Sequence, residues 1–448
     1  AFSIPIFTLG RSHRVFREWL ALTGLAATLI ITFIIYQQVV GSEVKALVWH
    51  EWFYIDGLSV LMEFIGSIMG IIVVLYSIKY IDYEYPSSST SGLKFSLYYG
   101  LILLFVGLMN WTCATNSLFM LYVALEISTL ATVYLVAFAW QRKSLEAAYK
   151  YLLLITVGVV FSLLGGVLLY CASGTGETLL ISKLGEIATE IPRTIALFSC
   201  GLFIVGFGTK AGLIPFHAWV PDAYAEAPAP ISVLLSGVVT KMGAYALART
   251  VIVFAPHFRE VVLLAVIMGS ISMILGIIMA FAQNDLKRLL AYSSVSEMGF
   301  IVAGLGLGTY LGIYGGLFQL INHTMLKGLL FLCSGALLYA VGSRNINQLR
   351  TMPKKMLVTS FCFIVAALAI GGMPPFSAFM SELTLFLALG ASKLLWASIV
   401  LIVAGFLTVV ALVWAGYRIF WAKPVTELAP VMNPGPKEGC LLYTSPSP

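Results

Sequence analysis

Charge is what this chain of 448 residues has least of. Only 10% of its residues are Asp, Glu, Lys or Arg, whereas 60% are hydrophobic and the mean hydropathy is +0.96. Soluble domains carry about 25% charged residues. The composition therefore excludes a soluble enzyme and predicts an all-α polytopic membrane protein.

Sequence patterns that bind redox cofactors are also missing. The six cysteines form no CxxC pair, and most lie in or beside apolar stretches, where cysteine serves as a small apolar side chain. No glycine-rich loop follows a strand pattern, which argues against nicotinamide binding. We therefore expect neither a cofactor nor a metal in this chain.

The two ends of the chain differ from its middle. There is no initiator Met, and residues 1–17 read as the end of a truncated first helix followed by a cytoplasmic loop. Residues 422–448 form a tail, of which 436–448 read as non-native sequence. We expect a fragment whose transmembrane domain covers 18–421, with an ordinary disordered terminus as the alternative for the tail.

Twelve stretches approach the roughly 20 apolar residues that a span requires. They cover residues 18–40, 54–81, 95–114, 117–140, 149–172, 194–214, 229–253, 260–282, 290–308, 312–341, 357–390 and 394–421. Two of them contain helix-breaking proline, at Pro215 and at Pro374–Pro375. We predict that both spans are interrupted; a simple kink is the alternative.

Basic residues predict the orientation. If the side of the N-terminal arm is called side A, it collects 17 of the 26 Lys and Arg residues, side B collects 6, and 3 lie within spans. The positive-inside rule makes side A cytoplasmic. We expect the membrane to be the cytoplasmic (inner) membrane of a prokaryote.

Five ionisable residues lie deep inside apolar stretches. They are Glu126, Lys210, Lys241, Lys327 and Glu382. Each such group costs about 2.5–3.5 kcal/mol near the bilayer centre on insertion scales, so a set of five indicates a pathway that handles charge. The sequence favours protons as the transported charge.

The spacing of these groups suggests roles. Glu126 and Lys210 form either a static ion pair or a switchable proton holder, because a neighbouring carboxylate changes the proton affinity of a buried lysine. His323 lies four residues before Lys327 on the same helix face, and histidine relays protons near neutral pH. Glu382 is the expected terminal acceptor.

Other candidates carry weaker signals. His217 and Asp222 flank the first break and are candidates to line water access. Glu297 is either a wall of the pathway or a packing residue. Asp56 is expected to cap its helix, and Glu63 lies near one end of a span, where it could reach the interface.

Two long segments carry a family resemblance. GFGTKAGLIPFHAWVPDAYAEAPAPISVLLSGVVTKMGAYALAR and QNDLKRLLAYSSVSEMGF resemble the antiporter-like proton-translocating membrane subunits of complex I, Mrp antiporters and membrane-bound nickel–iron hydrogenases. The resemblance runs from about 50 to 420. RKSLEAAYKYLLLITVG and the segment around HAWVPDAYAEAPAP look most like the F-type membrane subunit of hydrogenase-4.

The resemblance implies a fold, a function and partners. The family fold has fourteen helices, with two inverted five-helix repeats and broken helices, and the twelve spans match its second to thirteenth. Its translocation residues fall at Glu126, Lys210, Lys241, His323 with Lys327, and Glu382, where the family carries Lys or Glu.

On this basis we expect a proton-translocating subunit of a redox-driven complex of the NADH:quinone oxidoreductase or hydrogenase type. Its partners would be other antiporter-like subunits and a peripheral arm with iron–sulfur or nickel–iron centres, with no nucleic acid involved. The alternative is an Mrp-type sodium/proton antiporter subunit without a redox partner.

Overall fold

The computed structural model describes residues 3–9, 14–40, 46–48, 52–85, 92–174, 179–350 and 356–422. The segment 436–448, which reads as non-native sequence, lies outside the described residues. So do the other expected tail residues beyond 422 and the basic residues Lys45, Lys354 and Lys355.

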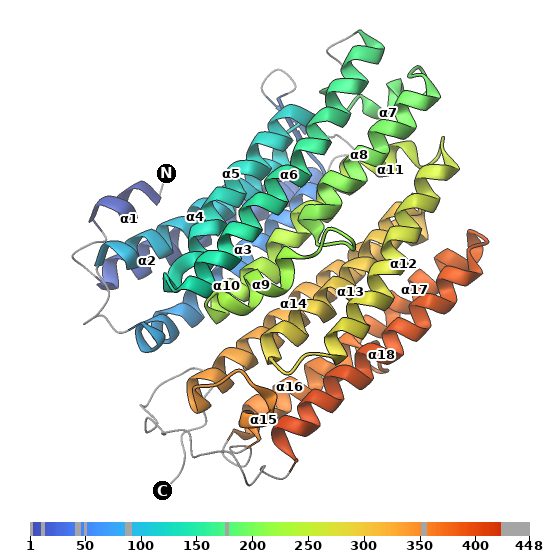
Figure 1. Ribbon diagram of the computed structural model, residues 1–448. Coiled ribbons are helices and arrows are strands. Elements are labelled where there is room, and N and C mark those ends of the chain that lie inside the picture. The colour runs from blue at the N-terminus through green and yellow to red at the C-terminus, as the bar shows by residue number, and fades with distance from the viewer. Residues whose placement is uncertain are drawn as a thin grey trace, which may run out of the picture.

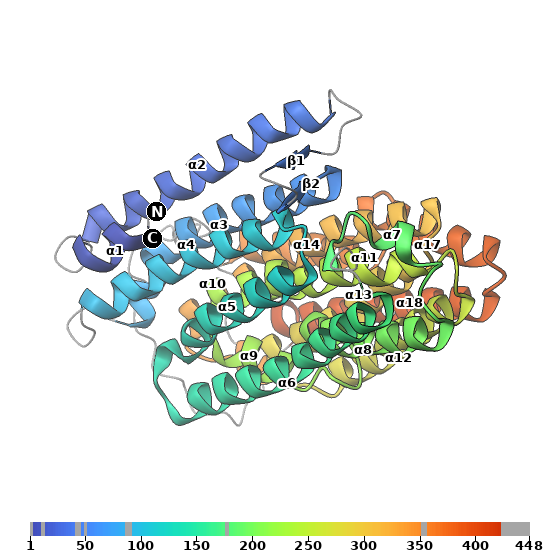
Figure 2. The same ribbon diagram turned by 90° about the horizontal axis from the view of Figure 1, so that it is seen from above.

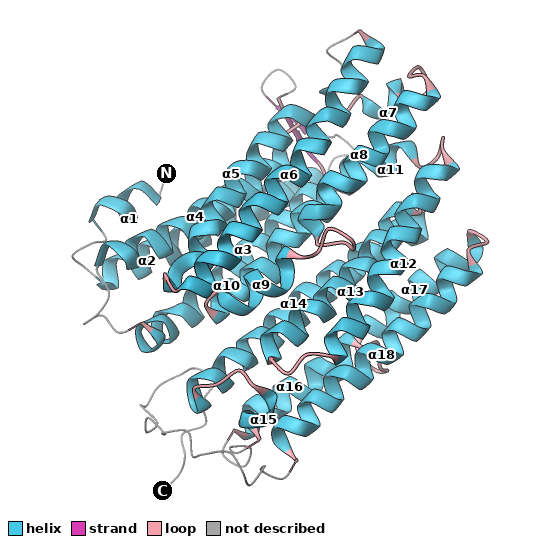
Figure 3. Ribbon diagram, viewed as in Figure 1, coloured by secondary structure: helices cyan, strands magenta, loops and turns pink. Residues whose placement is uncertain are grey.

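Within the described residues, 11 helices are long and apolar enough to cross a membrane. They are α2 (Arg14–Val40), α3 (Gly57–Glu84), α4 (Gly92–Ala114), α5 (Leu118–Val136), α6 (Arg142–Ser173), α8 (Arg193–Ala211), α10 (Ala229–Leu234) continued by the π-helical η3 (Leu235–Val239) into α11 (Thr240–Phe254), α12 (Arg259–Phe281), α13 (Leu286–Gly306), α14 (Tyr310–Val341) and α18 (Leu395–Phe420). The shorter α16 (Leu357–Ile370) and α17 (Ser377–Ala391) together form the eleventh predicted span, 357–390. The prediction of an all-α membrane protein is confirmed (Figures 1 and 3).

The remaining elements are short. They are α1 (Ser3–Leu9), η1 (Ala137–Ala139), α7 (Leu184–Ile187), α9 (Trp219–Glu226), α15 (Ile346–Leu349) and the antiparallel strands β1 (Ala46–Val48) and β2 (Phe53–Ile55). Hydropathy gave no signal for this hairpin, because two strands of three residues are too short to register as spans.

Helix ends differ from the prediction where a helix extends beyond its apolar part. α6 begins at Arg142 rather than at 149, because a capping box between Gln141 and Ser144 starts a polar first turn. α2 likewise begins at Arg14 rather than at 18. Apolar length therefore marks the membrane-embedded part of a helix and not its whole length.

Ten of the twelve spanning segments form two sets of five, and α2 and α3 precede them; the helices run roughly parallel in the view of Figure 1. The first comprises α4, α5, α6, α8–α9 and α10–α11; the second comprises α12, α13, α14, α16–α17 and α18. Five crossings separate the start of α4 from that of α12, so the two sets have opposite orientations. α2 lies at the edge of the bundle beside α3 (Figure 2).

In both sets the fourth span is broken, as predicted. α8 ends at Ala211, its C-cap Gly212 has φ 78°, and the chain passes through Pro215 before α9 begins. The freed backbone finds new partners, because the Ile214 N–H donates to Ser272 Oγ (3.0 Å) and Trp219 Nε1 donates to the Thr209 carbonyl (2.8 Å). Such satisfaction is what permits irregular backbone at membrane depth.

The second break has the same form. α16 ends before Gly371 and Gly372, the latter with φ 71°, and the chain passes through Pro374 and Pro375 before α17. The left-handed conformation at Gly372 favours glycine. Each broken span therefore carries a helix end into the interior of the bundle, beside an ionisable residue.

Close packing joins α11 to α8. A Cβ added at Gly243 would lie 2.7 Å from the Phe207 carbonyl oxygen and would also clash with the backbone of Ala211. Small residues allow such close approach of transmembrane helices. This contact fixes the position of Lys241, two residues before Gly243, relative to the broken span that carries Lys210.

Candidate functional site

The three intramembrane lysines are fully buried. Lys210, Lys241 and Lys327 have no exposed surface, although each lies on a helix within an apolar span. A lysine in that position needs hydrogen-bond acceptors around its amine. The acceptors that the structure supplies differ from one lysine to the next.

Lys210 lies against one turn of α5. Its Nζ donates to the carbonyl of Leu125 (2.7 Å) and to the hydroxyls of Ser128 (3.0 Å) and Thr129 (2.8 Å). Glu126 lies on the same turn but accepts a hydrogen bond from Thr156 Oγ1 of α6 (3.1 Å). Among the described residues, no ion pair within 4.0 Å joins Glu126 to Lys210, so the structure shows no static pair.

Lys241 contacts the histidine of α14. Its Nζ lies within hydrogen-bonding distance of His323 Nδ1 and donates to the Ser236 carbonyl (2.5 Å). That carbonyl belongs to the π-helical turn η3, immediately before α11. The structure therefore brings Lys241 and His323 together, although 82 residues separate them in the sequence.

Lys327 reaches the neighbouring helix α13. Its Nζ donates to Ser293 Oγ and lies 3.5 Å from the Leu290 carbonyl. Glu297 lies one turn further along α13, since residues four apart share a helix face. Glu297 is fully buried, and its Oε2 accepts from Gln319 Nε2 of α14 (2.6 Å).

Gln319 extends these contacts to α17. Its Oε1 accepts from Ser381 Oγ (2.5 Å), and Ser381 directly precedes Glu382. Ser381 also accepts from Asn322 Nδ2 (3.0 Å), and Asn322 Oδ1 accepts from Ser377 Oγ (2.7 Å). A row of polar groups therefore crosses from α11 through α14 and α13 to α17.

We call this row the polar axis. Its members are Lys241, His323, Lys327, Glu297, Gln319, Ser381 and Glu382. Sequence reasoning identified the ionisable members and missed the two uncharged ones, Gln319 and Ser381. The sequence does contain a signal for Gln319. Gln319, His323 and Lys327 follow one another at intervals of four residues on α14, which places them on the same helix face.

Three members of the axis carry a buried polar atom without a hydrogen-bond partner in the part of the chain that the structure describes. Among the described residues, Glu297 Oε1, His323 Nε2 and Glu382 Oε1 are buried without a hydrogen bond, as is Glu126 Oε1 next to Lys210. An unpaired buried polar atom costs about 1–3 kcal/mol and requires an explanation. Groups that exchange protons provide one.

Glu382 packs against the second helix break. A Cβ at Gly372 would clash with the Glu382 carboxylate, and one at Gly405 of α18 would lie 2.9 Å from its Oε2. The carboxylate therefore occupies the space that two glycines leave open. This position couples the end of the polar axis to the geometry of the break.

His217 and Asp222 lie apart from the axis. The ring of His217 lies near that of Tyr292, with their centroids 6.1 Å apart. Asp222 accepts from Lys150 (3.1 Å) and from Arg288 (2.8 Å), joining α9 to α6 and α13 at the side-A end. The expected role of these two residues in water access stays a prediction.

Glu63 is buried between α3 and α2. Its Oε2 accepts from Thr32 Oγ1 at 3.4 Å, and its side chain is not exposed at the surface. Within the part of the chain that the structure describes, no hydrogen bond joins Glu63 to the polar axis.

A second charged contact lies at the side-B end of α11. Arg249 Nη1 and Nη2 donate to Asp56 Oδ2 (2.7 Å) and Oδ1 (2.5 Å), and Nη2 also donates to Ser59 Oγ (2.8 Å). Asp56 caps α3 as predicted, because it accepts from the Ser59 N–H (3.0 Å). Burial opposes ionisation of Asp56, but the Arg249 guanidinium outweighs it and lowers the pKa of this carboxyl.

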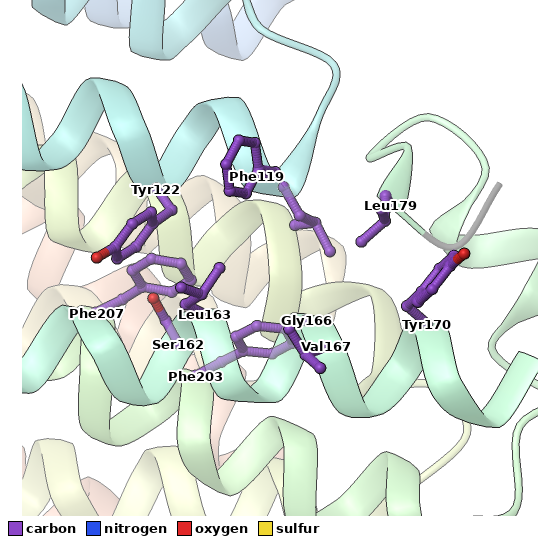
Figure 4. Close-up of a pocket in the computed structure, with 11 residues that line it drawn as sticks. Phe119, Tyr122, Ser162, Leu163, Gly166, Val167, Tyr170, Leu179, Phe203 and Phe207 are labelled. Carbon is purple, nitrogen blue, oxygen red and sulfur yellow. The ribbon is translucent and has the colours of Figure 1, made fainter. Parts of the chain in front are cut away.

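A recess of about 120 Å³ opens between α5, α6 and α8, and its lining is almost entirely apolar (Figure 4). Phe119 and Tyr122 line it from α5, and Phe203 and Phe207 line it from α8. No member of the polar axis lines this recess, so it is separate from the buried charges of the axis.

Together the twelve spanning segments, two broken helices and buried axis define an antiporter-like membrane subunit. The chain belongs to the NADH:quinone oxidoreductase/Mrp antiporter transmembrane family, whose pattern matches residues 115–408. This match covers more than half of the chain and confirms the resemblance that the two long segments indicated.

Curated relatives come from three kinds of complex. The chain is 35% identical to NADH-quinone oxidoreductase subunit N of Desulforudis audaxviator, over 79% of this chain and 69% of the relative. It is 30% identical to a hydrogenase-4 component F homolog of Methylacidiphilum infernorum, over 86% and 82% of the two chains. A putative antiporter subunit mnhD2 of Staphylococcus aureus is 34% identical, over 72% and 66%.

Solved structures share the fold. A chain of the archaeal membrane-bound sulfane sulfur reductase superposes with a TM-score of 0.86 at 25% identity, covering 95% of this chain and 87% of the other. A chain of the Mrp complex from Dietzia superposes with a TM-score of 0.83 at 22% identity, covering 96% and 83%. Both neighbours are parts of membrane complexes.

Proposed function

We propose that this chain is the proton-translocating membrane subunit of a redox-driven complex of the NADH:quinone oxidoreductase or hydrogenase type. The observation that carries the proposal is the buried polar axis from Lys241 to Glu382. Its titratable groups lie along a row of neighbouring side chains on the four helices α11, α14, α13 and α17, which is the arrangement that stepwise proton transfer requires.

In this proposal the chain holds no redox centre. Partner subunits with iron–sulfur or nickel–iron centres oxidise an electron donor, and other antiporter-like subunits complete the membrane arm. The names of the NADH-quinone oxidoreductase and hydrogenase-4 relatives support this assignment. The complex would lie in the cytoplasmic membrane of a prokaryote, with side A facing the cytoplasm.

The energy enters at Glu126 and Lys210. A change in the partner shifts the position or charge of Glu126, which alters the proton affinity of Lys210. Among the described residues, no side chain hydrogen-bonds to both Lys210 and Lys241, so transfer between them requires water or a movement of side chains. From Lys241 the proton passes His323 and the α13–α14 interface to Glu382, and leaves on side B.

The second candidate is an Mrp-type sodium/proton antiporter subunit that works without electron transfer. The 34% identity to the mnhD2 relative favours it, and the Mrp complex shares the fold. The polar axis serves either function, because both need a buried path for protons. The source of energy distinguishes them.

The test is to isolate the complex through an affinity tag on this chain and reconstitute it in liposomes. Lumenal pH is followed with a pH-sensitive dye, first after adding NADH with a soluble quinone, or hydrogen gas with a viologen dye, and then after imposing a sodium gradient. Donor-driven, protonophore-sensitive pH change with iron in the purified complex supports the redox proposal. Sodium-driven pH change from an iron-free complex contradicts it and establishes the antiporter.

A further inference from the structure

The face of α11 that carries Lys241 leads directly toward side B. Lys241, Tyr245 and Arg249 are four residues apart, so their side chains share one helix face. The eight residues from Lys241 to Arg249 correspond to a rise of about 12 Å. This is a shorter way out of the membrane than the polar axis, which crosses α14 to reach α17.

Arg249 lies at the side-B end of this helix face, and several side chains hydrogen-bond to its guanidinium or pack against it. In addition to Asp56 and Ser59, it donates through Nε to the Tyr245 hydroxyl (2.9 Å). Its guanidinium lies over the rings of Tyr54 and Tyr245, 5.2 and 5.0 Å from their centroids. Only 8% of its side-chain surface is exposed, so it is a fixed and largely buried positive charge.

Neither Tyr245 nor Arg249 is free to relay a proton. The Tyr245 hydroxyl donates to the Cys113 carbonyl (2.8 Å) while it accepts from Arg249, so its proton is already engaged. An arginine side chain does not deprotonate in proteins. A fixed arginine also repels cations, as it does in channels that exclude protons.

We propose that the Arg249–Asp56 pair is an electrostatic plug, which prevents a proton held at Lys241 from leaving to side B along α11 and directs it along the polar axis to Glu382. This inference rests on the proposed function, in that Lys241 must carry a transported proton. The pair also joins α3 to α11, and the experiment has to separate that structural role from the plug.

The decisive variant is the double substitution Arg249→Gln with Asp56→Asn. Amide side chains retain hydrogen bonding at both positions, and asparagine still caps a helix. Removing only one partner of a buried ion pair leaves the other charge unpaired, which strongly destabilises a protein. The double change avoids this, because it removes both charges. Arg193→Met is the matched control, because Arg193 is also a side-B arginine in an ion pair, with Glu260, but is exposed.

The measurement is passive proton conductance of the reconstituted complex without any electron donor. Liposomes with a potassium gradient and valinomycin provide the driving voltage, and a pH-sensitive dye inside reports proton entry. The positive charge of Arg249 alone, about 12 Å from Lys241 at an effective dielectric of about 20, is worth roughly tenfold in rate. The double change also removes the opposing charge of Asp56, which is screened more by water because its side chain is 25% exposed, against 8% for Arg249. We therefore expect the double variant to leak several-fold faster than wild type, with about tenfold as the upper bound, and Arg193→Met to leak at the wild-type rate.

The leak should depend on Lys241. Adding Lys241→Met to the double variant is expected to return conductance to the wild-type level. An assembled double variant with wild-type conductance, or a leak that persists without Lys241, would overturn the plug. The leak assay uses no electron donor, so it does not test the proposed function. Failure of the proposed function would instead be seen as the absence of donor-driven pumping in the wild-type complex.

Discussion

Replacing Gln319 with Leu should interrupt the polar axis between α13 and α17. Gln319 donates to Glu297 (2.6 Å) and accepts from Ser381 (2.5 Å), so the substitution removes both contacts at once. Leucine has a similar volume, and the site is fully buried. The fold should therefore remain while the connection is lost.

The size of the effect follows from the groups left unpaired. Glu297 already has one oxygen without a partner among the described residues, and the substitution removes the donor to the other. Leaving such a buried group unsatisfied costs about 1–3 kcal/mol. If that cost enters the barrier to transfer, the proton-pumping rate falls by roughly 5- to 150-fold.

The assay is donor-driven acidification in liposomes that contain the complex, with the amount of assembled complex measured in parallel. Gln283→Leu is the control for the substitution itself, because Gln283 lies just beyond the end of α12 in the second set and donates to the Met279 carbonyl, outside the axis. A Gln319→Leu complex that pumps at the rate of Gln283→Leu would show that proton transfer does not depend on the contacts of Gln319.

Two further predictions concern single contacts. Gly372→Ala should lower the pumping rate at least about tenfold relative to Gly342→Ala. Both glycines have positive φ, so each substitution introduces a backbone strain of roughly 1–2 kcal/mol, but only at Gly372 does the new Cβ meet the Glu382 carboxylate. Equal pumping rates of the two variants would contradict the role of this contact. Because Arg249 lowers the pKa of Asp56, their pair stabilises the fold at neutral pH and loses its contribution as pH falls below the ordinary aspartate value of 3.8. The difference in Tm between wild type and Asp56→Asn should therefore shrink as pH is lowered from 6 to 3, and a constant difference would show that the pair adds no pH-dependent stability.

Hydropathy and proline placement predicted the spans and both breaks, because the cost of exposing backbone and charge to lipid constrains any membrane chain. The break at Pro215 and that at Pro374–Pro375 are found where they were expected. The start of α6 at Arg142 was missed, because a helix can continue into water without apolar residues. The hairpin of β1 and β2 was missed for a different reason, since its strands are too short to leave a hydropathy signal.

The charged members of the site were visible in the sequence, but their connections were not. Gln319 and Ser381 resemble the many uncharged polar residues that apolar helices tolerate, and only packing shows that they join Glu297 to the residue that precedes Glu382 on α17. Arg249 was counted as a basic residue of side B. Arg249 lies on the same helix face as Lys241, but only the structure shows that Asp56, which caps α3, pairs with it.

The expected pairing of Glu126 with Lys210 shows a third limit. The residues do lie on adjacent helices, yet Lys210 bonds to the carbonyl and hydroxyls of α5 and Glu126 bonds to Thr156. Charge alone predicts that the two are neighbours. Which acceptor the amine takes depends on atomic positions that the sequence does not specify.

The most direct test of the central claim is to count protons moved per electron pair in liposomes that contain the complex with Lys241→Met. Lys143→Met serves as the control, because Lys143 is exposed and lies outside the axis. If protons pass along the polar axis, the Lys241→Met complex assembles normally and loses the protons that this subunit translocates, while the control retains the wild-type ratio. A wild-type ratio in the Lys241→Met complex would show that protons do not pass along the axis.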